Sequence, residues 1–283
     1  MTLAARFARV RPRLLRLAYS ELGDFGEAED VVQEAWLRLQ DTDVEAIENL
    51  DGWLTKVVAR LALDRLRSAR VRRETYVGPC LPEPLASADS ADPADRVTLD
   101  ESVSYALLTV LEQLSPAERT AFVLHDVFDV PFGDVAEVVG RTPEAVRQLA
   151  SRARRHVRSE SPRFDASRDE HDRAVRAFAR AVAEGSIEGL VAVLDPDVVW
   201  TSDGGGRASA IRRPQHGAER VARTWAVLSR KAVHAPIEVA LNGRLGLVLP
   251  FADRHRAALS FVVANGRITH LSAVRNPEKL HHL

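Results

Sequence analysis

The sequence predicts a multidomain chain in which two all-α domains precede a C-terminal α+β domain built as a cone. The chain has 283 residues, more than the roughly 100–200 residues of one typical domain. Apolar residues at helical spacing dominate residues 1–75 and 99–160. Residues 168–283 begin with helical patterns and end in alternating strands with Asn-Gly turns, which favours helices packed on a curved antiparallel sheet.

The composition is that of a water-soluble protein, with 46% hydrophobic and 28% charged residues. No apolar run approaches the roughly 18 residues that span a bilayer, and five arginines interrupt residues 1–20, so a signal peptide is not predicted. Cys80 is the single cysteine, which excludes an intrachain disulfide and a thiolate metal cluster. We therefore expect a cytoplasmic protein with no membrane partner.

The charge pattern points to nucleic acid although the formal net charge is only −1. Residues 60–73 carry six arginines against one aspartate, and residues 147–158 carry five arginines and no acid, so each segment is +5. Residues 74–101 carry one arginine against seven acids. Two basic helical patches around an acidic spacer are typical of two DNA contacts, although solvated helix faces would give the same pattern.

Composition also places the domain boundaries. We predict domains at residues 1–75, 99–160 and 168–283, with a linker at residues 76–98. The linker sequence YVGPCLPEPLASADSADPADRVT contains four prolines with Ser, Ala and Asp, which favours an extended, flexible segment.

The segment EDVVQEAWLRLQ (29–40) predicts an amphipathic helix whose apolar stripe includes Val31, Ala35 and Leu39. The opposite face carries polar residues and one leucine: Asp30, Gln33, Glu34, Leu37 and Arg38. Because Leu37 lies on this polar side, we expect a contact surface for a partner protein rather than a purely solvated face.

The next segment predicts a long helix that begins near Gly52, with Asn49 and Asp51 as capping residues. Its apolar residues supply a buried stripe, and its arginines occupy the remaining surface. These arginines, suited to phosphate contacts, are Arg60, Arg65, Arg67, Arg70, Arg72 and Arg73.

The second helical block contains the pattern of a helix-turn-helix. Ser115, Pro116 and Glu118 form a helix start signal with a capping box. Further on, a small residue, a glycine and a valine at 136, 140 and 146 have the spacing that lets two helices cross closely around a turn.

Thr142 is predicted to cap the second helix of this motif, and Pro143 presets its first φ angle. Its outward face carries residues suited to base edges and phosphates in a major groove. These residues are Glu144, Arg147, Gln148, Ser151, Arg152 and Arg155.

Residues 1–160 resemble a bacterial sigma factor of the extracytoplasmic-function type, a minimal member of the sigma-70 family. AEDVVQEAWLRL (28–39) is similar to the region 2 helix that docks on core RNA polymerase, which implies polymerase contacts at Asp30, Gln33, Glu34 and Arg38. WLTKVVARLALDRLRSARVRRE (53–74) resembles the part that reads the minus-ten element, and the helix-turn-helix resembles region 4, which reads the minus-thirty-five element. Many relatives carry Asn where this chain has Arg60, so minus-ten base capture transfers to Arg60 only weakly.

Residues 168–283 resemble SnoaL-like domains, whose fold is shared with nuclear transport factor 2 and ketosteroid isomerase. A subgroup of extracytoplasmic-function sigma factors has such a fused domain with DGGG and NP-acid-KL motifs and a similar linker. The matching residues here are Asp203, Gly204, Gly205 and Gly206, then Asn276, Pro277, Glu278, Lys279 and Leu280, with YVGPCLPEPL at 76–85. The resemblance implies regulation in cis, in place of a separate anti-sigma factor.

The cone fold encloses an apolar pocket that leaves room for a small-molecule ligand, and Trp200, Asp203, His216 and Arg275 could line it. A carboxylate in such a pocket can act as a base. However, the sequence has no nucleophile–base pair and no metal-ligand spacing, and Asp203 beside three glycines is typical of a turn-capping residue. We therefore expect no enzyme activity, no catalytic residue, no metal and no cofactor.

The main hypothesis is a sigma factor that takes core RNA polymerase to promoter DNA and is regulated by its C-terminal domain. Two alternatives stay open: a ligand-sensing DNA-binding regulator that works without polymerase, and a SnoaL-like enzyme fused to a DNA-binding module. We further expect Asp203 and residues 276–280 to lie near region 2, region 4 or the linker.

Overall fold

The computed structural model describes residues 2–73, 78–86, 104–160, 166–253, 255–281 and 283, with the side chains of residues 69–73 left out. The chain divides into two compact units. Unit 1 comprises Met1–Thr75 and Ser90–Glu160, and unit 2 comprises Tyr76–Asp89 and Ser161–Leu283. The first half of the predicted linker therefore groups with the C-terminal unit.

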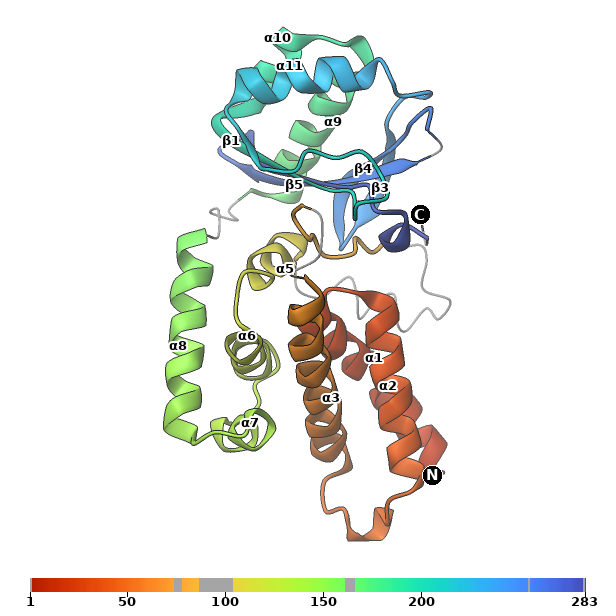
Figure 1. The fold of residues 1–283 in the computed structure, drawn as a ribbon, viewed down its shortest axis with the longest axis vertical. Coiled ribbons are helices and arrows are strands. Elements are labelled where there is room, and N and C mark those ends of the chain that lie inside the picture. Colours follow the sequence, from red (N-terminus) through yellow and green to blue (C-terminus); the bar gives the residue numbers. More distant parts are fainter. Residues whose placement is uncertain (1, 74–77, 87–103, 161–165, 254, 282) are drawn as a thin grey trace. The chain divides into compact units, whose positions relative to one another are not determined.

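The first part of unit 1 is a bundle of α1 (Leu3–Leu22), α2 (Phe25–Gln40) and α3 (Leu50–Arg73), with a short 3₁₀ turn η1 (Val44–Ala46) before α3. Figure 1 shows these helices side by side. Leu14, Leu54 and Leu39 are almost fully buried between them. The predicted cap at Asn49 is confirmed, because its side chain accepts a bond from the Gly52 amide at 3.0 Å. The helix begins at Leu50, so the other predicted cap, Asp51, lies inside its first turn.

The second part of unit 1 contains α5 (Tyr105–Leu111), α6 (Pro116–Phe122), the π-helical turn η2 (Val123–Val127), α7 (Phe132–Val139) and α8 (Pro143–Glu160). The predicted capping box at the start of α6 is confirmed, with Ser115 and Glu118 bonding reciprocally. The helix-turn-helix is confirmed as well: α7 ends at Gly140, whose φ of 72° is the left-handed conformation that glycine adopts readily. Ala136 and Val146 are buried where α7 and α8 meet.

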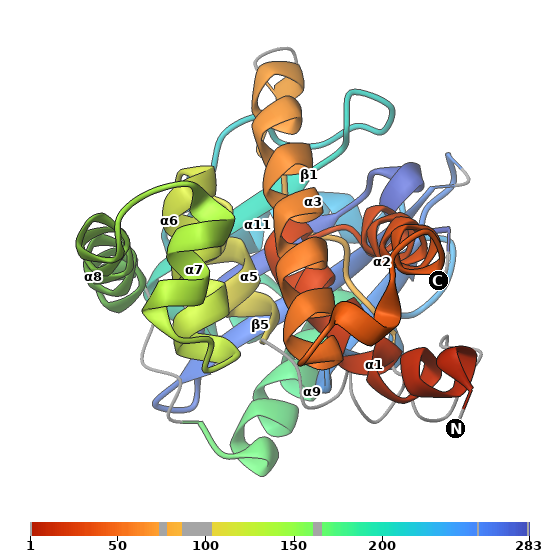
Figure 2. The same ribbon diagram turned by 90° about the horizontal axis from the view of Figure 1, so that it is seen from below.

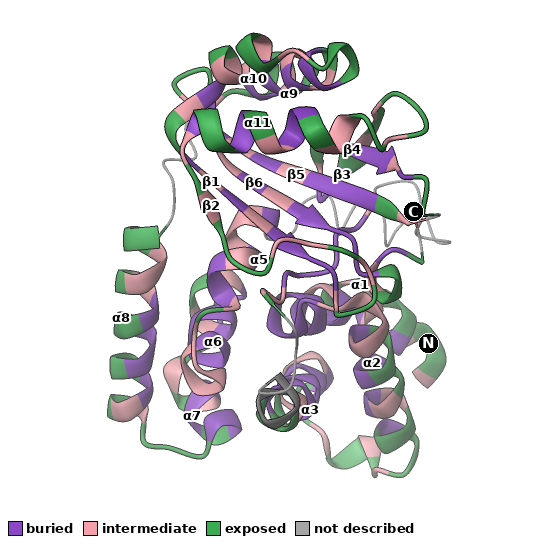
Figure 3. Ribbon diagram, turned by 45° about the horizontal axis from the view of Figure 1, so that its top comes forward, coloured by how far each residue is buried: buried purple, intermediate pink, exposed green. Residues whose placement is uncertain are grey.

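Unit 2 begins with α9 (Arg168–Glu184) and α10 (Ile187–Val193), followed by β1 (Leu194–Asp203), β2 (Gln215–His216) and α11 (Ala218–Ser229). The chain continues through β3 (Ile237–Leu241), β4 (Arg244–Pro250), β5 (Arg256–Ala264) and β6 (Arg267–Val274), and then η3 (Pro277–Lys279). The sheet has six strands in the order β2-β1-β6-β5-β4-β3. Figure 3 shows α9, α10 and α11 over one face of this sheet.

The α+β cone is confirmed, but the sheet is mixed where an antiparallel one was expected. β1 pairs in parallel with β6, while the other strand pairs are antiparallel. Hairpin signals identify neighbours in sequence, whereas β1 and β6 are joined by the rest of the domain, so their direction depends on tertiary packing. The two Asn-Gly turns are where they were predicted, with Asn242 and Asn265 both at positive φ.

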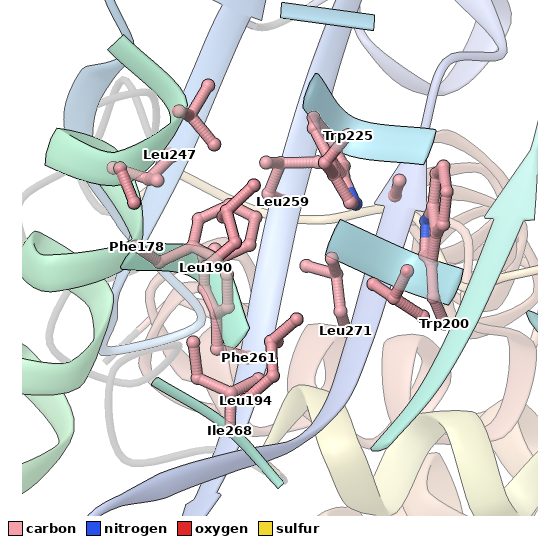
Figure 4. Packing of buried hydrophobic residues seen from close by; sticks show 14 of the residues in the cluster. Phe178, Leu190, Leu194, Trp200, Trp225, Leu247, Leu259, Phe261, Ile268 and Leu271 are labelled. Atoms are coloured by element: carbon pink, nitrogen blue, oxygen red, sulfur yellow. The ribbon is translucent and has the colours of Figure 1, made fainter. Parts of the chain in front are cut away.

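The core of unit 2 lies between the helices and the sheet and is rich in aromatic rings (Figure 4). Phe178 packs edge-on against Trp225 and Phe261 at centroid distances of 5.5 and 5.2 Å. Trp200 lies 5.0 Å from Trp225. This core holds the ends of β1 and β6 in place, and the DGGG and NPEKL motifs follow those ends.

Candidate nucleic-acid interface and linker clamp

The second helix of the helix-turn-helix, α8, presents the predicted recognition face to solvent. The Thr142 side chain accepts from the Ala145 amide at 3.3 Å and starts the helix. Val146, Leu149, Ala150 and Ala153 are buried. The predicted outward residues are all exposed, and they are Glu144, Arg147, Gln148, Ser151, Arg152 and Arg155.

The first turn of α8 holds one of these arginines in a defined position. Arg147 lies over the ring of Phe132 at 5.4 Å and forms an exposed ion pair with Glu144 at 3.3 Å. The pKa of Glu144 is lowered first by a hydrogen bond from the backbone N–H of Glu144 to its own carboxylate. The Thr142 hydroxyl and the charge of Arg147 lower this pKa further. Glu144 is thus a carboxylate at neutral pH, ready to accept a bond from a donor such as the cytosine amino group.

Of the α3 arginines whose side chains are described, Arg60 and Arg67 are exposed and Arg65 is half-buried, and two of them contact neighbouring helices of unit 1. Arg60 donates to the Glu137 carbonyl at 3.2 Å. Arg65 lies 3.4 Å from Asp30, and Arg67 lies 3.4 Å from Asp64. The side chains of Arg70, Arg72 and Arg73 lie outside the described residues.

The residues predicted to contact a partner protein lie on the outer face of α2. Four of them are exposed: Asp30, Gln33, Leu37 and Arg38. Glu34 is half-buried and forms a 2.6 Å ion pair with Arg38. Leu37 leaves 52% of its surface exposed although it is a large apolar residue. An apolar side chain among charges is typical of a protein contact.

Asp203 lies at the end of β1 and is fully buried. One carboxylate oxygen, Oδ1, accepts from the Gly205 amide at 2.9 Å, which is the turn-capping role that the sequence indicated. The other oxygen, Oδ2, accepts from the Leu81 amide at 3.0 Å and from Lys279 Nζ at 2.9 Å. Asp203 therefore joins its own turn to the linker segment and to the C-terminal motif.

Lys279 supplies the positive charge that balances Asp203. Its side chain is only 11% exposed. Besides Asp203, its Nζ donates to the Leu81 carbonyl and to Cys80 Sγ. Buried charges are stable when they are paired and hydrogen-bonded, and here both partners bond to the linker segment as well as to each other.

The glycines of DGGG allow this close packing. A Cβ on Gly205 would lie 2.5 Å from the Asn276 side chain, and its φ of +60° favours glycine. A Cβ on Gly204 would lie 2.2 Å from the Ala208 carbonyl oxygen. The Asp203 carbonyl accepts from the Arg275 and Asn276 amides at 2.7 and 3.1 Å, so the two motifs are also joined through their backbones.

A third residue that binds the linker was not singled out from the sequence. The Asn242 side chain accepts from the Leu85 amide at 3.1 Å, and the Asn242 amide donates to the Leu85 carbonyl at 2.8 Å. Next to it, Ala86 forms an antiparallel bridge with Leu241. Asn242 was predicted only as a turn residue, because an Asn-Gly pair gives no signal of a distant partner.

We call Asp203, Asn242 and Lys279 the linker clamp. The clamped segment, residues 80–86, is ordered by backbone hydrogen bonds, and Leu81, Glu83 and Leu85 are buried. Two apolar residues four apart within an otherwise acidic, proline-bearing stretch were the available sequence signal. The expectation of a flexible linker is wrong for this segment, because its backbone polar groups have fixed partners.

The residues expected to line a pocket of the cone are not gathered around one. Trp200 is packed in the aromatic core, and His216 lies on the exposed edge strand β2. Arg275 binds Asp253 at 2.9 Å and donates to Ser209, while its guanidinium lies 4.4 Å from the Phe251 ring. Asp203 is held in the linker clamp. These four side chains therefore do not form a common reaction site.

Two further observations concern the described residues alone. None of their helices is both long and apolar enough to cross a membrane. They also contain no group of three or more His, Cys, Asp or Glu side chains placed to hold a metal ion.

Family models match both helical parts of unit 1. The model for sigma-70 region 2 matches residues 6–72, and the model for sigma-70 region 4 matches residues 104–157. The first match contains α2 and most of α3, and the second contains the helix-turn-helix.

Relatives match nearly the whole chain. The ECF RNA polymerase sigma factor SigJ of Mycobacterium tuberculosis is 40% identical, over 97% of this chain and 92% of the relative. The probable ECF RNA polymerase sigma factor SigI of the same organism is 37% identical over 95% and 92%. The crystal structure of M. tuberculosis SigJ superposes with a TM-score of 0.81 at 36% identity and covers 99% of this chain and 98% of that one. With its two sigma regions and an α+β domain after them, the chain belongs to the extracytoplasmic-function sigma factors of the sigma-70 family.

Proposed function

We propose that this sigma factor contacts core RNA polymerase through α2, contacts promoter DNA through α3 and α8, and is regulated in cis by unit 2. The observation that carries the regulatory part is the linker clamp. Residues 80–86 belong to the covalent connection between region 2 and region 4, and within unit 2 they are bonded to the C-terminal domain by two side chains of opposite charge and one amide.

The DNA and polymerase contacts are supported by exposure and charge. The described arginines of α3 and α8 have exposed or half-buried side chains whose ion pairs lie at the surface. Surface ion pairs contribute little net free energy, about 0–1 kcal/mol, so DNA phosphates can replace the protein partners at low cost. On α2, exposed Leu37 supplies an apolar anchor among polar contacts.

Regulation through the linker follows from the chemistry of the linker clamp. Release of the linker segment would take the Leu81 amide from Asp203 and the Leu81 carbonyl from Lys279, and a buried ion pair that loses such hydrogen bonds is unfavourable. The linker segment therefore stays bound to unit 2 unless a change in unit 2 or the binding of polymerase supplies replacement partners. Such a contact needs no separate anti-sigma factor, because the regulator is part of the chain.

We further propose that unit 2 acts by binding the linker and not by catalysis. Asp203, the carboxylate considered as a base, has both of its oxygens engaged by the linker segment, Lys279 and Gly205. A base needs access to a substrate proton, whereas this carboxylate is fully buried.

The test is in vitro transcription with purified core polymerase on promoters that the wild-type holoenzyme selects from a random library. Asp203→Asn neutralises the buried carboxylate, Lys279→Met removes the bonds to the Leu81 carbonyl and Cys80, and Asn242→Ala removes the side-chain acceptor of the Leu85 amide. Each variant should change transcript yield at least about threefold while core binding persists. The matched control is Arg207→Gln with Glu278→Gln. Arg207 directly follows DGGG and Glu278 belongs to NPEKL; they form an exposed 2.6 Å ion pair, and no described contact joins their side chains to the linker.

The outcomes separate the parts of the proposal. Wild-type yield in all three variants of the linker clamp would refute regulation through the linker and leave the sigma assignment in place. Failure of the full chain to bind core polymerase would refute the sigma function itself.

A further inference from the structure

Within unit 1, the region 2 bundle and the region 4 helices pack directly on each other. α3 contacts both α6 and α7, and α1 contacts η2. Figure 2 shows α7 beside α3. This interface has a surface layer of ion pairs and a buried layer around Glu21, and the two layers differ in how they respond to solvent.

The surface layer joins α3 to α7. Lys56 Nζ lies 2.6 Å from Asp134 and 2.8 Å from Glu137. The hydrogen bonds that Lys56 donates to the Asp134 and Glu137 carboxylates raise the pKa of Lys56. Together with the bond from Arg60 to the Glu137 carbonyl, this layer engages two basic residues of α3. Being partly exposed, these contacts can exchange for water or phosphate.

The buried layer joins α1 to α6. Glu21, in the last turn of α1, is fully buried, and its Oε2 accepts from the Thr120 hydroxyl at 2.9 Å. Thr120 is also fully buried. No hydrogen-bond partner is found for Glu21 Oε1 among the described residues. A carboxylate with one hydrogen bond in such a place is poorly solvated.

The charged groups around Glu21 do not supply a full counter-charge. Arg119 of α6 is the cation that acts on it, but Arg119 donates at 2.8 Å to Glu112 of α5. Arg16, on the same helix as Glu21, lies over the Phe128 ring at 5.1 Å. Burial therefore raises the pKa of Glu21 to about 7, against the opposing effects of the Thr120 bond and Arg119.

We propose that Glu21 and Thr120 form a proton-dependent lock: with Glu21 protonated, region 2 and region 4 stay together, and loss of this proton favours their separation. In the separated state Glu21 meets water, where the ordinary pKa of the carboxyl is 4.5. The closed state thus binds more protons than the open state between about pH 4.5 and 7. The closed state is most stable below this pH window. Within the window the equilibrium constant for closure falls about tenfold per pH unit, and above the window it no longer changes.

The consequence for transcription rests on the proposed function. Opening frees Lys56 and Arg60 from α7, so acidification would keep the α3 surface engaged within the chain and a neutral pH would release it. The lock itself is a property of the chain without polymerase, so it can be tested separately from promoter recognition.

The test is single-molecule energy transfer in the full chain, between dyes on Glu45→Cys and Ser159→Cys in a Cys80→Ser background. Residues 45 and 159 are exposed and lie on either side of the interface. The ratio of open to closed molecules should rise about tenfold per pH unit between pH 5 and 7. In Glu21→Gln, a neutral isostere, this part of the slope should vanish. Glu48→Gln, an exposed carboxyl control, should retain it.

A second variant keeps the proposal testable if Glu21→Gln fails to fold. Thr120→Val removes the hydroxyl that favours the ionised carboxylate, so the upper end of the pH window should move above 7. Circular dichroism checks that every variant is folded from pH 5 to 8. A flat wild-type response, an unchanged slope in Glu21→Gln, or an unmoved window in Thr120→Val would each overturn the proposal.

Discussion

The recognition helix α8 and the linker clamp use charged side chains in opposite surroundings. On α8, the Glu144–Arg147 pair is 3.3 Å long, and more than half of each side chain is exposed. In the linker clamp, Asp203 and Lys279 are 2.9 Å apart, with 0% and 11% of their side chains exposed. Exposed charges exchange partners easily, which suits DNA binding, whereas buried charges bind one partner in one geometry.

The largest effect on stability is expected from Asp203→Ala. It leaves Lys279 Nζ and the Leu81 amide without their buried acceptor, and it should destabilise unit 2 by about 3–5 kcal/mol. The measurement is urea unfolding followed by Trp200 and Trp225 fluorescence, with Trp36 and Trp53 replaced by Phe.

The control for that measurement is Asp197→Ala, an exposed aspartate on the same strand β1. It should change the free energy of unfolding by less than about 0.5 kcal/mol. Equal effects of the two variants would contradict the view that the charges of the linker clamp are structurally essential.

An intermediate effect is expected from Gly205→Ala. The added Cβ meets Asn276 at 2.5 Å in a left-handed conformation, and the cost should be about 2–3 kcal/mol. Gly133→Ala in α7 is the matched control, since nothing lies within 4 Å of its Cβ position. In Gly133→Ala the midpoint of urea unfolding should equal or exceed that of the wild type, because alanine is a better helix former than glycine.

The smallest effect on stability, with a clear effect on binding, is expected from Arg147→Ala on α8. Unfolding should change by less than about 0.5 kcal/mol because the side chain is exposed. Holoenzyme affinity for its promoter should fall by about 1–3 kcal/mol, as for the loss of a base contact. Fluorescence anisotropy measures this affinity, with Arg180→Ala on α9 as the charge-matched control. An affinity equal to that of the wild type in Arg147→Ala would show that Arg147 does not contact promoter DNA.

Local patterns accounted for most of the helical half of the molecule. The Ser115–Glu118 capping box, the left-handed Gly140 and the exposed face of α8 all depend on residues within one or two turns of each other. Such features are readable because spacing along the chain fixes them. The roles of the exposed residues in DNA and polymerase binding remain predictions.

Long-range partners escaped prediction for an equally physical reason. Lys56 meets Asp134 and Glu137, and Asn242 meets Leu85, yet Lys56 and Glu137 are 81 residues apart, Asn242 and Leu85 are 157 apart, and no local pattern links them. Helical spacing places Glu21 on the same face of α1 as the buried Leu14 and Ala18, but it does not reveal that Thr120 of a distant helix covers this face. The parallel pairing of β1 with β6 belongs to the same class.

By itself, the amino-acid order determined the domain sequence, the helix-turn-helix, the basic faces and the two motifs of unit 2, because each is a local or compositional property. Only the tertiary structure decided that those motifs meet at residues 80–86 and that Glu21 is enclosed between α1 and α6. Burial converts an ordinary carboxylate into a specific contact, and burial depends on which distant surfaces come together.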